Sequence, residues 1–168
     1  MAKAARIQKT NALRELDRAG ISYELRTYDV EGDNVPADYG LGVAHLLGED
    51  PDRVFKTLVT VTPSGGHVVC CVPVALELDL KRAAAAAGEK SLAMLHVRDL
   101  EATTGYVRGG CSPVGMKKPF PTLVDETAQL YDTIAISGGR RGLQIVLAPD
   151  DLASFVDATF ADIARGVA

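Results

Sequence analysis

The chain reads Val54-Phe55-Lys56-Thr57-Leu58-Val59-Thr60-Val61-Thr62 near its centre, then Pro63-Ser64-Gly65-Gly66, then His67-Val68-Val69-Cys70-Cys71-Val72-Pro73-Val74. The first stretch is rich in β-branched residues, which favour strands. The proline and glycines that follow it indicate a hairpin-like break. The last stretch is almost wholly apolar, so we expect both of its faces to be covered. Together they predict two core strands.

Helices and further strands are predicted on both sides of this pair. Helix boundaries are indicated by the capping residue Thr10 with Gly20, by Pro36, by Asp79 before an alanine run, and by Pro149. The predicted helices cover residues 10–20, 36–47, 79–88, 98–104 and 149 onward, and the additional strands cover residues 21–28, 91–97, 122–124, 132–137 and 143–147. This pattern predicts one mixed α/β domain over residues 1–168, with one larger, mostly antiparallel sheet or open barrel.

Composition and charge narrow the class of protein. With 168 residues, of which 47% are hydrophobic and 24% charged, the chain is long enough to bury one core. No apolar run approaches the roughly 18 residues that span a bilayer. Residues 1–9 carry positive charge without a hydrophobic stretch after it, so we expect no secretory signal, no membrane contact and a cytoplasmic location. A net charge of −4 argues against broad binding to DNA or other nucleic acid.

The cysteines and histidines predict neither a metal site nor disulfides. There are three cysteines, two of them adjacent, and three histidines without the spacing of a ligand set. The glycine motifs match neither a Walker A loop nor a dinucleotide fingerprint. We therefore expect no metal and no cofactor.

A glycine-rich loop with positive neighbours is the clearest sign of a ligand site. It runs from Thr104 to Gly115, contains Gly109, Gly110 and Ser112, and is followed by two lysines. Because glycine permits close backbone approach, such a loop can point several N–H groups at one oxygen. The alternative is a tight turn with solvated lysines.

A second glycine turn, Ser137-Gly138-Gly139-Arg140-Arg141-Gly142, adds two guanidinium groups that suit phosphate recognition. With the first loop it forms a locally basic region on an acidic protein, which favours one docked polyanion. The basic residues concerned are Arg108, Lys117, Lys118, Arg140 and Arg141. A plain hairpin turn and a chance cluster on a solvated face are the alternatives.

Lys56 and Cys111 are the two candidates for chemistry. Lys56 is the only charged residue in its strand and either extends to water or points into a cavity, where burial would lower its pKa. Cys111 lies in the basic glycine loop, where positive charge favours a thiolate. A cysteine nucleophile normally needs a histidine base, and no histidine is linked to Cys111 by a readable motif, so we do not expect it to be one.

Several motifs recur in the order in which one known family carries them. They are Val54-Phe55-Lys56-Thr57-Leu58, Val72-Pro73-Val74 with Leu78-Asp79-Leu80-Lys81, Thr104-Gly105-Tyr106 through Gly109-Gly110-Cys111-Ser112-Pro113-Val114-Gly115, and Ser137-Gly138-Gly139-Arg140-Arg141-Gly142-Leu143. From about residue 9 to residue 163 the chain resembles the YbaK/EbsC family of free-standing aminoacyl-tRNA deacylases. These are relatives of the editing domain that is inserted in bacterial prolyl-tRNA synthetases.

The resemblance implies a fold and a set of site residues. The fold is a mixed α/β domain with a curved, mostly antiparallel, barrel-like sheet surrounded by helices. The implied catalytic residues are Lys56, Gly109 and Gly110. The implied substrate-binding residues are Tyr28, Tyr39, Thr57, Ser112, Ser137 and Gly138, and the basic residues named above would contact tRNA. Gln144 stands where such sequences tend to have an acidic residue.

The resemblance also implies an activity and partners. YbaK-like members remove cysteine from tRNA(Pro), and in the chemistry proposed for them the substrate's own thiol attacks its ester. Lys56 and the glycine amides would then position the substrate and stabilise charge. Misacylated tRNA(Pro) is the expected partner and prolyl-tRNA synthetase a candidate second one. The alternatives are an alanyl- or seryl-tRNA deacylase that activates water, and a non-catalytic module that binds tRNA or the synthetase.

Overall fold

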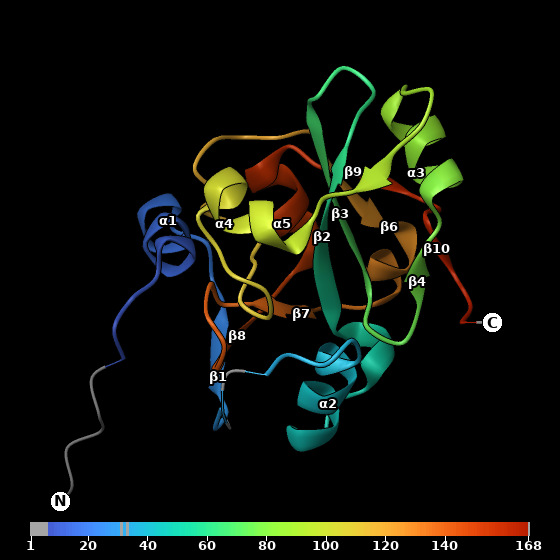
Figure 1. Ribbon diagram of the computed structural model, residues 1–168. Helices are drawn as coiled ribbons and strands as arrows, with labels where there is room; N and C mark the ends of the chain where they lie inside the picture. The colour runs from blue at the N-terminus through green and yellow to red at the C-terminus, as the bar shows by residue number, and fades with distance from the viewer. Residues whose placement is uncertain (1–6, 31, 33, 168) are drawn as a thin grey trace, which may run out of the picture.

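Five α-helices and three β-sheets make up the described part of the chain, which comprises residues 7–30, 32 and 34–167 of the computed structural model (Figure 1). The helices are α1 (Asn11–Ala19), α2 (Tyr39–Leu46), α3 (Leu80–Ala87), α4 (Val97–Thr104) and α5 (Pro149–Val156). The strands are β1 (Glu24–Thr27), β2 (Phe55–Val61), β3 (His67–Pro73), β4 (Glu77–Leu78), β5 (Ala93–Met94), β6 (Thr122–Asp125), β7 (Ile134–Ser137), β8 (Leu143–Leu147), β9 (Thr159–Ala161) and β10 (Ala164–Arg165). The mixed α/β class is confirmed.

The largest sheet has the strand order β5-β2-β3-β6-β9. Its two predicted core strands, β2 and β3, pair antiparallel along their whole length, from Phe55–Pro73 to Val61–His67. The prediction that β3 is covered on both faces is confirmed, because residues 68–72 are at most 2% exposed. One face packs on a cluster that includes α1, β7 and β8, and the other packs on α3.

The prediction of one sheet or open barrel is only partly met. The strands form three sheets, and the described strands close no barrel. The second sheet has the order β1-β8-β7, and the third pairs β10 with β4. In the largest sheet β6 pairs parallel with both β3 and β9, because long connections through α3, α4 and α5 return the chain to the same end of the sheet.

The capping residues predicted the positions of the helices well. The Thr10 hydroxyl accepts from Leu13 N at 3.3 Å, and Gly20 adopts a left-handed φ of 70° after α1. α2 begins at Tyr39, later than the Pro36 start that we predicted, because residues 36–39 form a turn in which Tyr39 N donates to Pro36 O. The described residues contain no helix long and apolar enough to cross a membrane. The prediction on the N-terminal signal concerns residues 1–9, of which residues 1–6 lie outside the described part.

The Asp125 carboxylate joins β6 to the C-terminal strands. It is 1% exposed, and one oxygen accepts from the backbone N–H groups of Ile163 and Ala164 at 3.0 Å each. The other oxygen accepts from Thr127 N at 3.2 Å. The short strands β9 and β10, which no sequence pattern predicted, are positioned by this carboxylate.

We expect Asp125→Ala to lower the free energy of unfolding by about 2–4 kcal/mol, because it leaves buried N–H groups without acceptors. The matched control is Asp162→Ala, which removes a 61% exposed carboxylate that pairs with Arg82 at 3.2 Å and should cost less than about 1 kcal/mol. Urea unfolding of both variants measures the difference. Equal losses would show that the buried carboxylate has no special role.

Candidate active site

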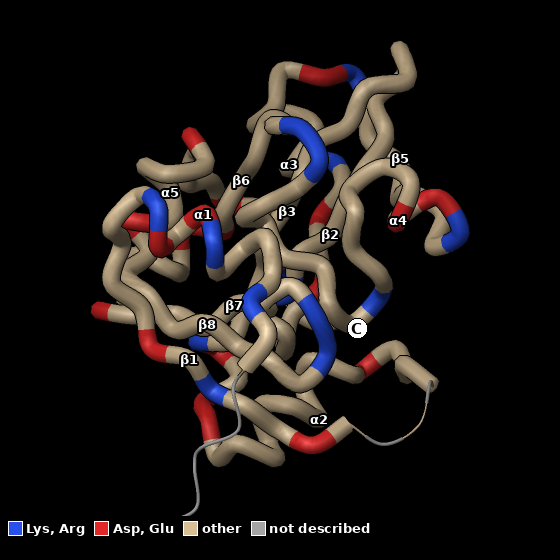
Figure 2. Tube along the Cα trace, turned by 90° about the vertical axis from the view of Figure 1, so that its left-hand side faces the viewer, with Lys and Arg blue, Asp and Glu red and all other residues tan. Residues whose placement is uncertain are grey.

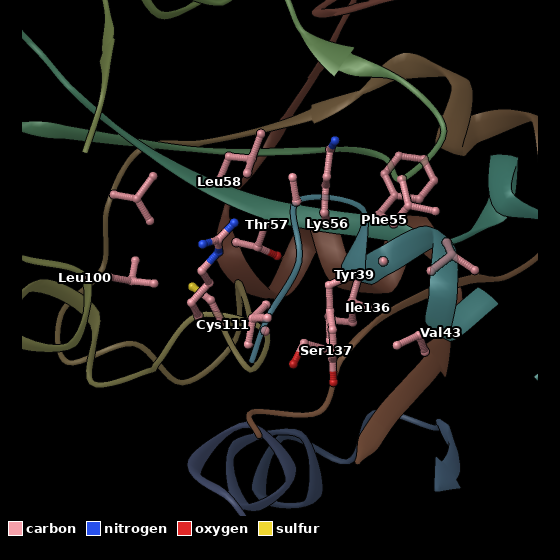
Figure 3. Close-up of a pocket in the computed structure, with 18 of the residues that line it drawn as sticks. Tyr39, Val43, Phe55, Lys56, Thr57, Leu58, Leu100, Cys111, Ile136 and Ser137 are labelled. Atoms are coloured by element: carbon pink, nitrogen blue, oxygen red, sulfur yellow. The ribbon is translucent and has the colours of Figure 1, made fainter. Parts of the chain in front are cut away.

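A pocket of about 370 Å³ opens between β2, β7, α2, α4 and the 104–115 loop (Figure 3). Many of the residues predicted from sequence line it. They are Tyr28, Tyr39, Lys56, Thr57, Arg108, Gly109 and Ser137, together with Cys111. Six consecutive residues of the chain, Val54 to Val59, also line it, so the edge of β2 itself forms one wall.

Lys56 lies at one side of this pocket. Its side chain is partly buried, and burial lowers the pKa of its ammonium, although the carboxylate of Glu77 acts in the opposite direction. Figure 3 shows the ammonium pointing away from Ser137 and Cys111. Strand alternation explains this placement, since Phe55 and Thr57 occupy the opposite face of β2. The ammonium therefore lies on the side of the pocket away from Ser137 and Cys111.

Two tyrosines form a hydrogen-bonded pair on the opposite wall. The hydroxyls of Tyr28 and Tyr39 are 2.9 Å apart. Burial raises the pKa of Tyr39, and the hydrogen bond that its hydroxyl shares with Tyr28 raises it further. The ring of Tyr39 also limits the space at Gly109, where an added Cβ would lie 3.4 Å from it. Tyr39 therefore stays protonated at neutral pH, and the hydrogen-bonded pair forms one wall of the pocket.

The two glycine loops touch each other, as the idea of a combined site requires. A Cβ on Gly110 would lie 2.8 Å from Arg140 Cα and 3.1 Å from Arg141 N, so only glycine allows this backbone contact. A Cβ on Gly109 would lie 3.0 Å from Arg141 Cδ. The contact holds two arginines beside the rim of the pocket.

Three of the predicted catalytic and substrate-binding residues do not line the pocket. Gly110, which we expect to stabilise substrate charge, donates its N–H to Val107 O at 3.0 Å, so this amide already has a backbone partner. Ser112 is fully buried and its hydroxyl accepts from Val114 N at 3.3 Å. Gly138 donates to Leu143 O at 2.9 Å in the turn between β7 and β8. All three shape the loops around the pocket.

The predicted basic residues lie on two connections, the one between α4 and β6 and the turn between β7 and β8. In Figure 2, basic segments lie on the loops beside β7. Arg140 Nη1 donates to Gln8 O at 2.6 Å and Arg141 Nη1 to Gly32 O at 3.1 Å. Lys117 Nζ donates to Ala102 O at 3.3 Å, and Lys118 lies 5.5 Å from the ring centre of Phe120. Of the five, Arg108 and no other lines the described pocket.

Sequence reasoning gave no role to Gln144, which also lines the pocket. It is 3% exposed, and its Nε2 donates to Glu49 Oε1 at 2.9 Å, while Arg26 pairs with the other oxygen of Glu49. Its Oε1 has no hydrogen-bond partner among the described residues. One signal was available, because Gln144 is the polar residue of an otherwise apolar strand, and such residues are buried with a partner.

The cysteine that lines the described pocket is not activated as a nucleophile. Burial raises the pKa of the Cys111 thiol to about 12, so it stays protonated at neutral pH. None of the histidines lines the pocket. The described residues also contain no group of three or more His, Cys, Asp or Glu side chains that could hold a metal ion.

Comparison with known proteins assigns the class. A family model for the aminoacyl-tRNA editing domain matches residues 42–155. A curated protein of Enterococcus faecalis, named "Putative Cys-tRNA(Pro)/Cys-tRNA(Cys) deacylase EbsC", is 48% identical over 163 residues, which cover 97% of this chain and 98% of that protein. The chain therefore belongs to the aminoacyl-tRNA editing domain family, in its YbaK/EbsC group.

Solved structures share the fold. One is described as the "Crystal structure of a putative trans-editing enzyme for prolyl tRNA synthetase"; it has a TM-score of 0.76 and 23% identity, and the match covers 93% of this chain and 96% of that one. A crystal structure of a hypothetical protein has a TM-score of 0.81 and 20% identity, with 93% and 100% covered. At these identities the likeness concerns the fold alone.

We expect Gly110→Ala to lower the free energy of unfolding by about 1–3 kcal/mol, because the new methyl group would overlap the Arg140 backbone. Gly42→Ala is the matched control. That glycine lies within α2 with nothing within 4 Å of an added Cβ, so alanine should be neutral or stabilise by up to about 1 kcal/mol. Urea unfolding distinguishes the two, and an equally harmless Gly110→Ala would contradict a tight loop contact.

Proposed function

We propose that this protein is a trans-acting deacylase of cysteinyl-tRNA, with Cys-tRNA(Pro) as its main substrate and Cys-tRNA(Cys) as a second one. Membership of the editing family supports the reaction class, and the name of the E. faecalis relative supports the amino acid. The matched region supports residues 1–168 acting as one editing domain. We place the reaction in the cytoplasm, where tRNA is charged.

The observation that carries this proposal is the lack of an activated cysteine and of a histidine base in the described pocket. Cys111 is protonated, and no histidine of the described pocket is present to activate it or a water. A cysteinyl ester needs neither, because it brings a thiol of its own. A pocket that only folds and orients such a substrate can therefore accelerate its cleavage by proximity.

The proposed reaction is an internal transfer. The substrate's sulfur attacks its own ester carbonyl carbon, a C–S bond forms, and the C–O bond to the 3′-terminal ribose breaks. The thiol proton passes to the departing ribose oxygen, and cysteine leaves as a cyclic thiolactone that water later opens. Lys56 would hold the ribose or its neighbouring phosphate, and the Gly109 amide would face the developing oxyanion.

Recognition of the tRNA body would fall to the basic residues around the pocket. Arg108 at the rim and Arg140 and Arg141 beside it suit phosphate contacts, because guanidinium groups bind phosphates in a bidentate manner. Lys117 and Lys118 would extend this surface. Prolyl-tRNA synthetase is the proposed partner that supplies the misacylated tRNA.

The substrate panel tests the proposal. Purified protein should release labelled cysteine from Cys-tRNA(Pro), also in the presence of a chelator, and should leave Ala-tRNA and Ser-tRNA intact because neither carries a thiol. We expect Lys56→Ala to reduce the rate by about 10²–10³-fold, whereas Lys81→Ala, an exposed lysine of α3, should have no effect. Release of alanine or serine would favour a water-activating enzyme, and tight binding without release a non-catalytic module.

Removal of the protein thiol tests the absence of a nucleophile. We expect Cys111→Ala to keep its rate within about threefold of the wild type, because a thiol with a pKa of about 12 is less than 0.1% ionised at neutral pH. Initial rates of cysteine release at matched protein concentration measure this. A loss of the size expected for Lys56→Ala in a variant that unfolds at the wild-type urea concentration would assign Cys111 to the chemistry.

A further inference from the structure

The hydrogen-bond register of β2 decides which of its backbone groups face the pocket. Val74 N donates to Val54 O at 2.8 Å at one end of the β2–β3 ladder, and Thr62 N donates to Gly66 O at 2.9 Å at the other. In an antiparallel ladder, bonded and non-bonded pairs alternate. Even-numbered residues of β2 therefore bond to β3, and the N–H and C=O groups of odd-numbered residues point to the opposite edge.

Only the far end of that opposite edge is paired by β5. β5 pairs with Thr60 and Val61, and Leu95 N donates to Val59 O at 3.0 Å, as the register requires. β5 forms no pairs with β2 between Phe55 and Thr57. Phe55 and Thr57 both line the pocket.

β7 approaches the same edge from the other side. Gly138 N donates to Leu143 O at 2.9 Å, so the backbone groups of even-numbered residues of β7 bond to β8. The backbone N–H and C=O groups of Ala135 and Ser137 therefore point toward β2. β2 and β7 meet at one isolated parallel bridge between Val54 and Ala135. The two strands are joined there.

The next rung of this parallel ladder is missing. It would pair Lys56 with Ser137, by bonds from Ser137 N to Phe55 O and from Thr57 N to Ser137 O. No such pair is present in the described sheets. The end of β7 is held elsewhere, because the Thr10 hydroxyl of the α1 cap donates to Gly138 O at 2.5 Å. Figure 3 shows Thr57 and Ser137 on the two sides of the resulting gap.

We infer that the aminoacyl group of the substrate fills this missing rung, with its α-ammonium donating to Phe55 C=O and its ester carbonyl accepting from Thr57 N–H. This inference rests on the proposed function for the identity of the ligand. It assigns the main chain of β2 as the amino-acid subsite and Thr57 N–H as an oxyanion donor.

One amino-acid residue has the shape that the gap requires. In a parallel pair, a single residue donates its N–H to one residue of the neighbouring strand and accepts at its C=O from the residue two positions later. Phe55 and Thr57 stand in that relation. An aminoacyl ester carries one nitrogen donor and one carbonyl on either side of its α-carbon, as an amino-acid residue does, so it can replace Ser137 in the rung.

The subsite also supplies a donor that the glycine loop lacks. Gly110 N–H is bonded to Val107 O, which leaves the Gly109 amide as the loop's contribution. Charge develops on the ester oxygen during attack, and fixed backbone donors stabilise it without reorganisation. Thr57 N–H is such a donor, because β3 holds its strand along its entire length.

Amide hydrogen exchange and NMR shifts test the rung with a defined probe, 3′-(L-cysteinylamino)-3′-deoxyadenosine, in which an amide replaces the scissile ester. In the free protein we expect Thr57 N–H to exchange faster than Lys56 and Leu58 N–H, which the β3 ladder protects. The probe should slow exchange at Thr57 by about tenfold or more and shift its resonance downfield, with Lys56 and Leu58 unchanged. Equal responses at all three amides would overturn the assignment.

Amide-to-ester substitution separates catalysis from folding. An α-hydroxy analogue of threonine at position 57 removes the Thr57 N–H and weakens the Lys56 carbonyl as an acceptor in the β3 ladder. We expect it to lower the rate of cysteine release by about 10²-fold with only a small fall in the urea midpoint. The same exchange at Leu58 removes a ladder bond, so it should lower stability and spare the rate. A wild-type rate with the ester at position 57 would refute the oxyanion role.

The two proposals can fail separately. If the wild-type protein releases cysteine from tRNA but Thr57 N–H does not respond to the probe, the subsite is wrong and the proposed function stands. If Thr57 responds but no cysteine is released, the subsite stands and the activity is wrong.

Discussion

The arrangement of the pocket depends on β2, which is a strand of the largest sheet and also contacts the second sheet through β7. β2 is fully paired with β3 on one edge, while its other edge is joined to β7 at Val54–Ala135 and to β5 at Thr60–Met94. Between these two joints the edge is open, and this opening is the pocket. Unpaired backbone groups cost about 1–3 kcal/mol each when they are buried, so the gap persists only because the surrounding structure holds the strands apart and the opening admits solvent or a ligand.

Other groups around the pocket also lower the stability of the folded state while they contribute to the site. Burial lowers the pKa of Lys56, so the folded state holds its charge less favourably than water does. Gly110 has no side chain, and this allows its loop to contact the backbone of the Arg140 turn. These costs are local and small beside the buried core on both faces of β3. Functional sites commonly keep such unfavourable groups, because optimising them for stability would remove the function.

Much of the fold could be predicted because its signals are local. Thr10, Gly20, Asp79 and Gly88 are capping residues whose effect needs no tertiary contact, and the structure places them as caps. The pairing of β6 and β9 could not be predicted, since parallel pairing depends on long connections. Within the site, residue types indicated a pocket with a lysine and glycine loops. The hydrogen bond between Gln144 and Glu49 joins residues 95 positions apart, so no local pattern could predict it. The bond from Gly110 N–H to Val107 O is local, but the glycine motif alone does not say which of its amides a turn will use.

Recognition through the main chain has a consequence for specificity. If Phe55 C=O and Thr57 N–H hold the α-ammonium and the ester carbonyl, they hold groups that every aminoacyl-tRNA carries, and they cannot tell one amino acid from another. Pocket walls alone discriminate poorly between similar small side chains, by roughly 10–200-fold per methylene. A site without a nucleophile of its own adds a second filter, because an ester without a reactive side chain is bound but not cleaved. Under the proposed function, selection for cysteine therefore arises in the chemical step, and the binding step has only to exclude side chains too large for the pocket.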